Sequence, residues 1–207
     1  MTDLVDDLES VVTAACAALR SATDRDWDVP AAGLTWTARS TVEHVADDLF
    51  AYAGQIATAT PELEDYVPFD FSAERDGESQ VTTHVRREAG NEGVVRALDA
   101  CGGMLVSLAR TRSADVRGYH PYGVSDSHGF AAMGTVETLL HLYDVAGPLG
   151  LTWEPDPDVV RRALERLFPD APTDGDPWQT LLRLTGRDPS APLESWRWDG
   201  RPAAERA

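Results

Sequence analysis

Apolar residues recur at helical spacing along most of the chain, and this pattern restricts its fold more than any other feature. In residues 3–22, Leu4, Leu8, Val11 and Ala15 stand three or four positions apart, so they share one face of an α-helix. No segment shows the strict apolar–polar alternation of a half-buried strand. The sequence therefore predicts an all-α protein. We expect its helices at residues 3–22, 40–60, 91–110, 130–146, 156–168 and 176–186.

Turn-forming residues mark where these helices begin and end. The tetrapeptide STVE at residues 40–43 fits a capping box at the start of the second helix. Gly-Pro at 147–148 is a strong stop for the fourth, and Asp-Pro pairs at 156–157 and 176–177 are typical of the first turns of the last two. Gly102 and Gly103 either weaken the third helix or allow close contact with a neighbour.

Two long polar connections, residues 62–87 and 113–129, separate these helices. Connections of that length are usually functional or mobile. Four helices, one long crossover and a helical tail predict an antiparallel four-helix bundle. We expect the bundle to span residues 1–150, and residues 151–207 to form a short, mainly helical extension packed on it. The sequence WRW at 196–198 fits either a short strand or a packed tail.

The composition excludes several classes of partner. A net charge of −17 argues against binding nucleic acid or an anionic membrane through a broad basic face. No apolar run approaches the ~20 residues of a membrane span, and the acidic N-terminus is unlike a signal peptide, so we expect a cytoplasmic protein. Cys16 and Cys101 are expected to be buried thiols rather than a disulfide or metal ligands. The absence of lysine, with single residues Ile56 and Asn91, indicates the codon bias of a GC-rich genome, actinobacterial or halophilic.

Three side chains have the character of metal ligands. Glu137 and His141 stand four apart on one predicted helix, so they share a face, and His44 lies on another. The helix around Glu137 is apolar nearly all round, which predicts burial, and a buried Glu–His pair needs a partner. Two imidazoles and one carboxylate suit zinc, with nickel as an alternative, and leave positions open for water or substrate. The alternatives are an ordinary surface pair and a core histidine bonded to backbone.

The loop before that helix supplies candidates for a pocket. We expect residues 113–129 and 62–87 to border one pocket above the metal. Arg117, Tyr119 and Tyr122 are candidate binding residues for a polar cofactor. His120 is a candidate proton donor or fourth ligand, as is His128, although both also fit ordinary loop histidines.

Two further residues complete the candidates. Asp144 follows His141 by three residues, on nearly the same face, so it is a candidate catalytic residue that orients His141 or a bound water. The alternative is a charge in an unfavourable place near a helix C-terminus. His84, in the acidic crossover, is expected to be exposed.

The motif GFAAMGTVETLLHLYDVAGPLG at residues 129–150, with LTW at 34–36 followed by His44, resembles the DinB-like superfamily, most closely its mycothiol-dependent maleylpyruvate isomerase type. The resemblance covers roughly residues 1–150. It implies a four-helix bundle in which His44, Glu137 and His141 bind a divalent metal, usually zinc, and it includes an H-x-x-D motif ending at Asp144. The segments LLRLTGR (181–187) and WRWDG (196–200) are similar to relatives less specifically, and the isomerase itself has a larger C-terminal domain than residues 151–207.

The resemblance implies a metal-dependent enzyme that uses mycothiol for S-transfer to, or isomerisation of, a small electrophilic substrate. Metal binding would lower the pKa of the thiol, which would come from the cofactor because neither cysteine lies near the motifs. A metal-dependent hydrolase that activates water, and a non-catalytic metal- or small-molecule-binding protein on the same bundle, remain alternatives. A homodimer also remains open.

Overall fold

The computed structural model describes residues 3–191, 193 and 195–206. This part of the chain folds into six α-helices and two short 3-10 helices, without a β-strand; its β-type pairings are isolated bridges. The prediction of an all-α protein is confirmed. The elements are α1 (Leu4–Arg20), α2 (Ala38–Ala57), η1 (Arg87–Ala89), α3 (Gly90–Thr111), α4 (Ser127–Ala146), α5 (Pro157–Leu167), α6 (Pro177–Leu184) and η2 (Ala203–Glu205).

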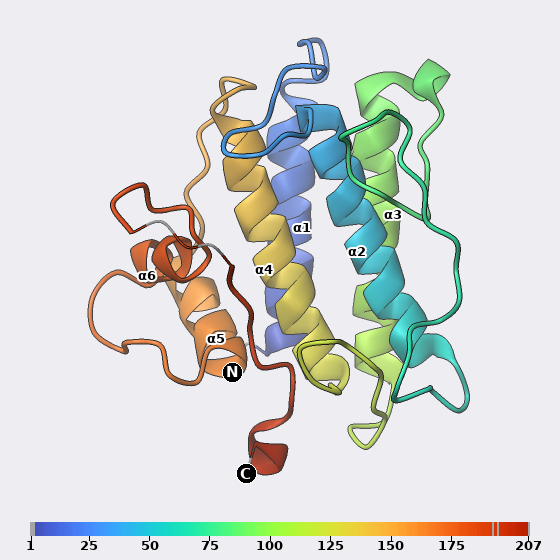
Figure 1. Ribbon diagram of the computed structural model, residues 1–207, viewed down its shortest axis with the longest axis vertical. Helices are drawn as coiled ribbons and strands as arrows, with labels where there is room; N and C mark the ends of the chain where they lie inside the picture. The colour runs from blue at the N-terminus through green and yellow to red at the C-terminus, as the bar shows by residue number, and fades with distance from the viewer. Residues whose placement is uncertain (1–2, 192, 194, 207) are drawn as a thin grey trace.

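The four long helices, α1 to α4, lie side by side (Figure 1). Helix α2 packs against α3 and α4, and α1 packs against the same two helices. Helix α5 packs on α4 and, to a smaller extent, on α1, while α6 packs on α5. Within the described ranges, no helix has the combination of length and apolar character that crossing a membrane requires.

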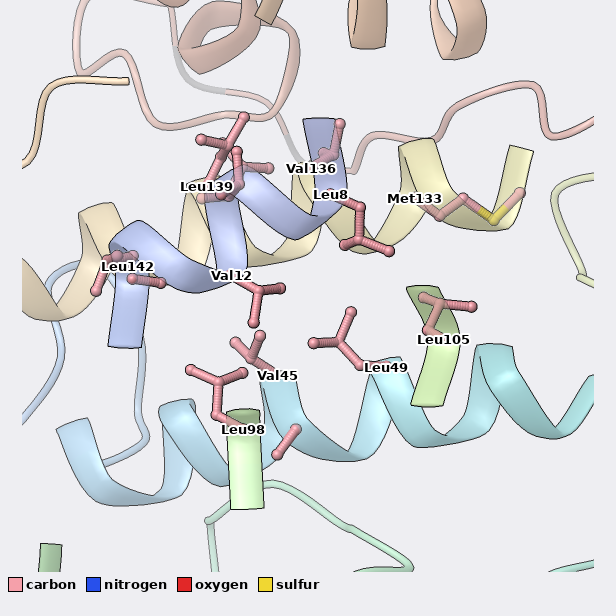
Figure 2. Packing of buried hydrophobic residues seen from close by; sticks show 14 of the residues in the cluster. Leu8, Val12, Val45, Leu49, Leu98, Leu105, Met133, Val136, Leu139 and Leu142 are labelled. Atoms are coloured by element: carbon pink, nitrogen blue, oxygen red, sulfur yellow. The ribbon is translucent and has the colours of Figure 1, made fainter. Parts of the chain in front are cut away.

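Buried aliphatic side chains fill the space between the long helices (Figure 2). Helix α4 has buried residues all round its circumference because other helices cover it on several sides. Gly134 allows α4 to approach α2 closely, since a Cβ there would lie 2.7 Å from Cδ2 of Leu49. The core residues labelled in Figure 2 are Leu8, Val12, Val45, Leu49, Leu98, Leu105, Met133, Val136, Leu139 and Leu142.

Two helices begin two or more residues earlier than the sequence predicts. Helix α2 starts at Ala38 because the side chain of Thr37 accepts a hydrogen bond from the backbone N–H of Ser40 at 3.1 Å. The predicted capping box at Ser40 is therefore wrong, and Glu43 pairs instead with Arg39 at 2.8 Å. Helix α4 starts at Ser127, capped by Asp126, rather than at residue 130.

The crossover between α2 and α3 is fastened to one face of α2. The carboxylate of Asp47 accepts hydrogen bonds from the backbone N–H groups of Thr82 and Thr83, at 2.9 and 2.7 Å. Two turns earlier on α2, the hydroxyl of Ser40 accepts a hydrogen bond from the backbone N–H of Ser79 at 3.3 Å. These bonds hold the later part of the crossover beside the segment of α2 that carries His44.

The C-terminal segment returns along α4, where the last residues run between α5 and the loop before α4 (Figure 1). The N–H of Gly200 donates to the carbonyl of Tyr122, and the N–H of Asp199 donates to that of Leu167, both at 2.8 Å. Trp198 is buried, and residues 196–198 form no strand. The WRW sequence is thus a packed tail.

Candidate metal centre

His44 from α2 meets Glu137 and His141 from α4. Their potential ligand atoms, one from each residue, all lie within 4.8 Å of one another, and the two imidazole centroids are 5.1 Å apart. The close packing of α2 on α4 brings the helices together, and the four-residue spacing puts Glu137 and His141 on the same face. These three residues could hold a metal ion, which is the arrangement that the sequence predicts.

His141 makes a hydrogen bond at each ring nitrogen. Nδ1 lies 3.0 Å from Oδ2 of Asp144, and Nε2 lies 3.2 Å from Oε2 of Glu137. Burial disfavours the charged imidazolium, but these two carboxylates outweigh burial and raise the pKa of His141 to about 9. Burial likewise opposes the charged form of Glu137, yet the hydrogen bond and charge of His141 hold the pKa of this carboxyl below its ordinary value.

The pKa of His44 is shifted in the opposite direction. Its burial, followed by the charge of His141, lowers its pKa to about 4, so the imidazole is neutral at physiological pH. Nδ1 is 3.0 Å from the hydroxyl of Ser79, and the ring of Trp36 stands edge-on to the imidazole at 4.8 Å between centroids. A neutral imidazole fixed in this way is ready to donate a lone pair to a metal.

Asp48 is a neighbour of the site that the sequence analysis missed. Its Oδ2 lies 3.2 Å from Nε2 of His44, one helical turn away on α2. Burial, and then the negative charge of Glu137, raise the pKa of Asp48 well above its usual range. The detectable signal was a second His–acid pair at four-residue spacing, which mirrors the pair formed by Glu137 and His141.

A hollow of about 470 Å³ opens beside Glu137. Tyr66 from the crossover and His120 and Tyr122 from the loop before α4 line it, so both long connections border one pocket, as the sequence predicts. The N–H of Tyr122 donates to Nδ1 of His120 at 3.1 Å, which leaves the ring proton of a neutral His120 on Nε2. Burial lowers the pKa of His120 to about 4, with the charge of Glu137 opposing it. The C-terminal segment contributes Trp196 and Trp198 to the same wall, which the sequence did not indicate.

A second hollow, of about 630 Å³, opens beside His141. His141, Asp144 and Arg187 line it, and Trp196 lines both hollows. The C-terminal segment therefore borders both the hollow beside Glu137 and the hollow beside His141.

The other candidates lie away from the three-residue group. Arg117 faces the chain terminus, where it pairs with Glu205 at 2.7 Å, and the ring of Tyr119 packs edge-on against Tyr66; neither lines the hollow beside Glu137. His128 is exposed in the first turn of α4, so it is not placed to be a fourth ligand, and His120 lies in the hollow outside the group.

The remaining polar candidates behave as expected. His84 is exposed and lies 2.9 Å from the hydroxyl of Ser72. Cys16 and Cys101 are both free and buried, and burial raises the pKa of each thiol to about 11. Neither cysteine belongs to the ligand group, so a reactive thiolate at this site would have to come from a bound molecule.

The fold and the site thus define an all-helical protein with a three-residue group suited to a divalent metal. Comparisons of the chain with protein-family models, curated proteins and solved structures find no match.

Proposed function

We propose that the protein is a divalent-metal-dependent enzyme in which a small thiol attacks a small electrophilic substrate. The observation that carries the proposal is the convergence of His44, Glu137 and His141 within 4.8 Å, with one hollow beside Glu137 and another beside His141. The resemblance to the DinB-like superfamily names mycothiol as the thiol, and the packing of α1 to α4 suits the helical bundle of that superfamily.

The residues present fit a metal by their chemistry. Two imidazoles and one carboxylate form a ligand set typical of catalytic zinc sites, which keep a further position open; nickel also accepts these donors. A bound divalent cation lowers the pKa of a thiol that it holds, which makes thiolate available at neutral pH. His120 and Tyr122 line the adjoining hollow, where they could donate hydrogen bonds to a polar cofactor or to the substrate.

Sulfur would form a bond to the electrophilic carbon of the substrate. In a transfer reaction the leaving group departs with the electron pair of its bond, and in an isomerisation the sulfur is released again after rotation. The thiol proton would pass to solvent or to a neighbouring base. The hollow beside Glu137 and the hollow beside His141 offer space for the thiol and the electrophile next to the candidate ligands.

The first test is elemental analysis of the purified protein, followed by a thiol-transfer assay with mycothiol and a chromogenic aryl halide. We expect about one zinc or nickel ion per chain and thiol consumption that disappears after metal removal. The matched variant is Glu137→Gln, which replaces the carboxylate of one candidate ligand with an uncharged amide of the same shape. Ester hydrolysis without any thiol requirement would instead support a hydrolase.

A specific observation favours a second candidate, a non-catalytic metal-binding protein. Asp48 stands beside His44 and could supply a fourth protein ligand, which would close the coordination shell as in structural zinc sites. X-ray absorption spectroscopy of the zinc-loaded wild type and of Asp48→Asn separates the two cases. An unchanged spectrum in the variant supports an open catalytic site, whereas loss of an oxygen ligand supports a closed one.

A further inference from the structure

Arg187, from the C-terminal extension, reaches the candidate metal centre. Its guanidinium makes a two-pronged ion pair with Asp144: Nε lies 2.9 Å from Oδ1 and Nη2 lies 2.7 Å from Oδ2. Both side chains are largely buried, at 12% and 3% exposed. A buried, two-pronged pair fixes the plane of the carboxylate as well as its charge.

The carboxylate that Arg187 holds is the one that contacts His141. A carboxylate can only accept, so the proton of this 3.0 Å hydrogen bond lies on Nδ1 of His141. The ring is thereby oriented with Nε2 toward Glu137, where a metal would lie. Asp144 is near the C-terminal end of α4, where a negative charge is unfavourable, and Arg187 supplies the compensating charge.

The end of α6 directs the side chain of Arg187 toward Asp144. Helix α6 ends in a Schellman motif: the N–H of Arg187 donates to the carbonyl of Leu182 at 2.8 Å, and that of Gly186 donates to Arg183 at 3.3 Å. Gly186 has a φ of +71°, a left-handed conformation that favours glycine. The chain therefore reverses immediately before Arg187, and its side chain is directed at α4.

We propose that Arg187 is a positioning residue of the metal centre, which acts by holding Asp144 so that Asp144 fixes the ring of His141. The inference rests on the proposed metal-dependent function and gives the extension a specific task in it. The extension thereby supplies the residue that holds Asp144, the hydrogen-bond partner of the candidate ligand His141 on α4.

The chain offers a matched control for this contact. Arg162, on α5 of the same extension, makes an equivalent two-pronged pair with the buried carboxylate of Asp7 on α1, with both distances 2.7 Å. This pair lies outside the ligand group. Arg162→Gln therefore removes a comparable ion pair between the extension and the long helices without changing the surroundings of His141.

The first experiment measures zinc affinity by competition with a chromogenic chelator for the wild type, Arg187→Gln, Arg187→Lys and Arg162→Gln. We expect Arg187→Gln to weaken zinc binding about 10–100-fold, as loss of an outer partner of a ligating histidine does. Lysine restores the charge but not the fork, so Arg187→Lys should fall between wild type and Arg187→Gln. Arg162→Gln should bind zinc like the wild type, and thermal melts of all four separate affinity from stability.

The second experiment needs no metal. In the metal-free protein, the Nδ1 proton of His141 should give a slowly exchanging, downfield NMR resonance that persists in Arg162→Gln and disappears in Arg187→Gln. Retention of this resonance in Arg187→Gln, or zinc affinity equal to wild type in that variant, would overturn the positioning role. Failure of the wild type to bind zinc would count against the proposed function, and the resonance would then decide the role of Arg187 by itself.

Discussion

The affinity of the site for a divalent metal should depend steeply on pH because of a single proton. In the metal-free protein the pKa of His141 is about 9, so this ring is an imidazolium at neutral pH, whereas the pKa of His44 is about 4 and its ring is neutral. Glu137, with a lowered pKa, is already ionised. Metal binding requires the Nε2 lone pair of His141, so one proton must leave as the metal enters.

The size of the effect follows from that proton. Below pH 9, each unit of pH should raise the apparent affinity about tenfold, or about 1.4 kcal/mol. Between pH 6.5 and 8.5 the gain is roughly 100-fold, and the curve should level above the pKa of His141, about 9. Asp144→Asn removes a carboxylate that raises this pKa, so the levelling should move to lower pH in that variant.

The assay is a competition titration with a chelator of known pH dependence, together with calorimetry in two buffers of different ionisation enthalpy. The calorimetry should count about one proton released per zinc ion bound. An affinity that stays flat between pH 6.5 and 8.5 would refute the assignment of His141 as a ligand that is charged in the metal-free state. Equal curves for wild type and Asp144→Asn would refute the role of Asp144.

The same proton determines the pH dependence of folding without metal. The pKa of His141 in the folded chain, about 9, is above its ordinary value of 6.5, so folding favours the charged form. This contribution to stability is fully present below pH 6.5 and is lost as the pH rises through 9. His44 has the opposite sign, because its lowered pKa contributes stability above pH 6.5 that is lost as the pH falls towards 4.

Three other predictions test the site and the packing. His44→Ala should lower zinc affinity roughly 100-fold or more. The melting temperature of the metal-free variant should stay within about 4 °C of that of the metal-free wild type, because His44 is not part of the hydrophobic core. Metal analysis and thermal melts check both. Tyr122→Ala and His120→Ala should each weaken thiol binding about tenfold at unchanged metal content, measured by calorimetry. Gly102→Ala should destabilise the fold by about 1–3 kcal/mol, since its Cβ would lie 2.6 Å from a valine of α1, whereas Gly103→Ala, which faces open space, should stabilise it by up to about 1 kcal/mol. Urea unfolding measures both, and effects of the same sign would contradict the packing.

The sequence by itself determined the all-helical fold and the ligand group. Helical periodicity is a local property, since the apolar faces of α1 to α4 follow from residues three or four positions apart. Glu137 and His141 were recognisable for the same reason, because their spacing puts them on one face wherever the helix lies. The Asp-Pro pairs at 156–157 and 176–177 also marked two helix starts, and the structure has aspartate caps there.

Only the tertiary structure decided which distant residues surround these candidate ligands. Ser79 reaches His44 because Asp47 fastens the crossover to α2, and Arg187 reaches Asp144 because the chain reverses at Gly186. The start of α2 was likewise decided by a tertiary contact. The hydroxyl of Ser40 accepts a hydrogen bond from Ser79 of the crossover, and the side chain of Thr37 caps the helix instead. Such contacts join residues up to 43 positions apart, as in the pair of Arg187 and Asp144. Their energies depend on where long connections return to the helices, and no local spacing in the sequence encodes that return.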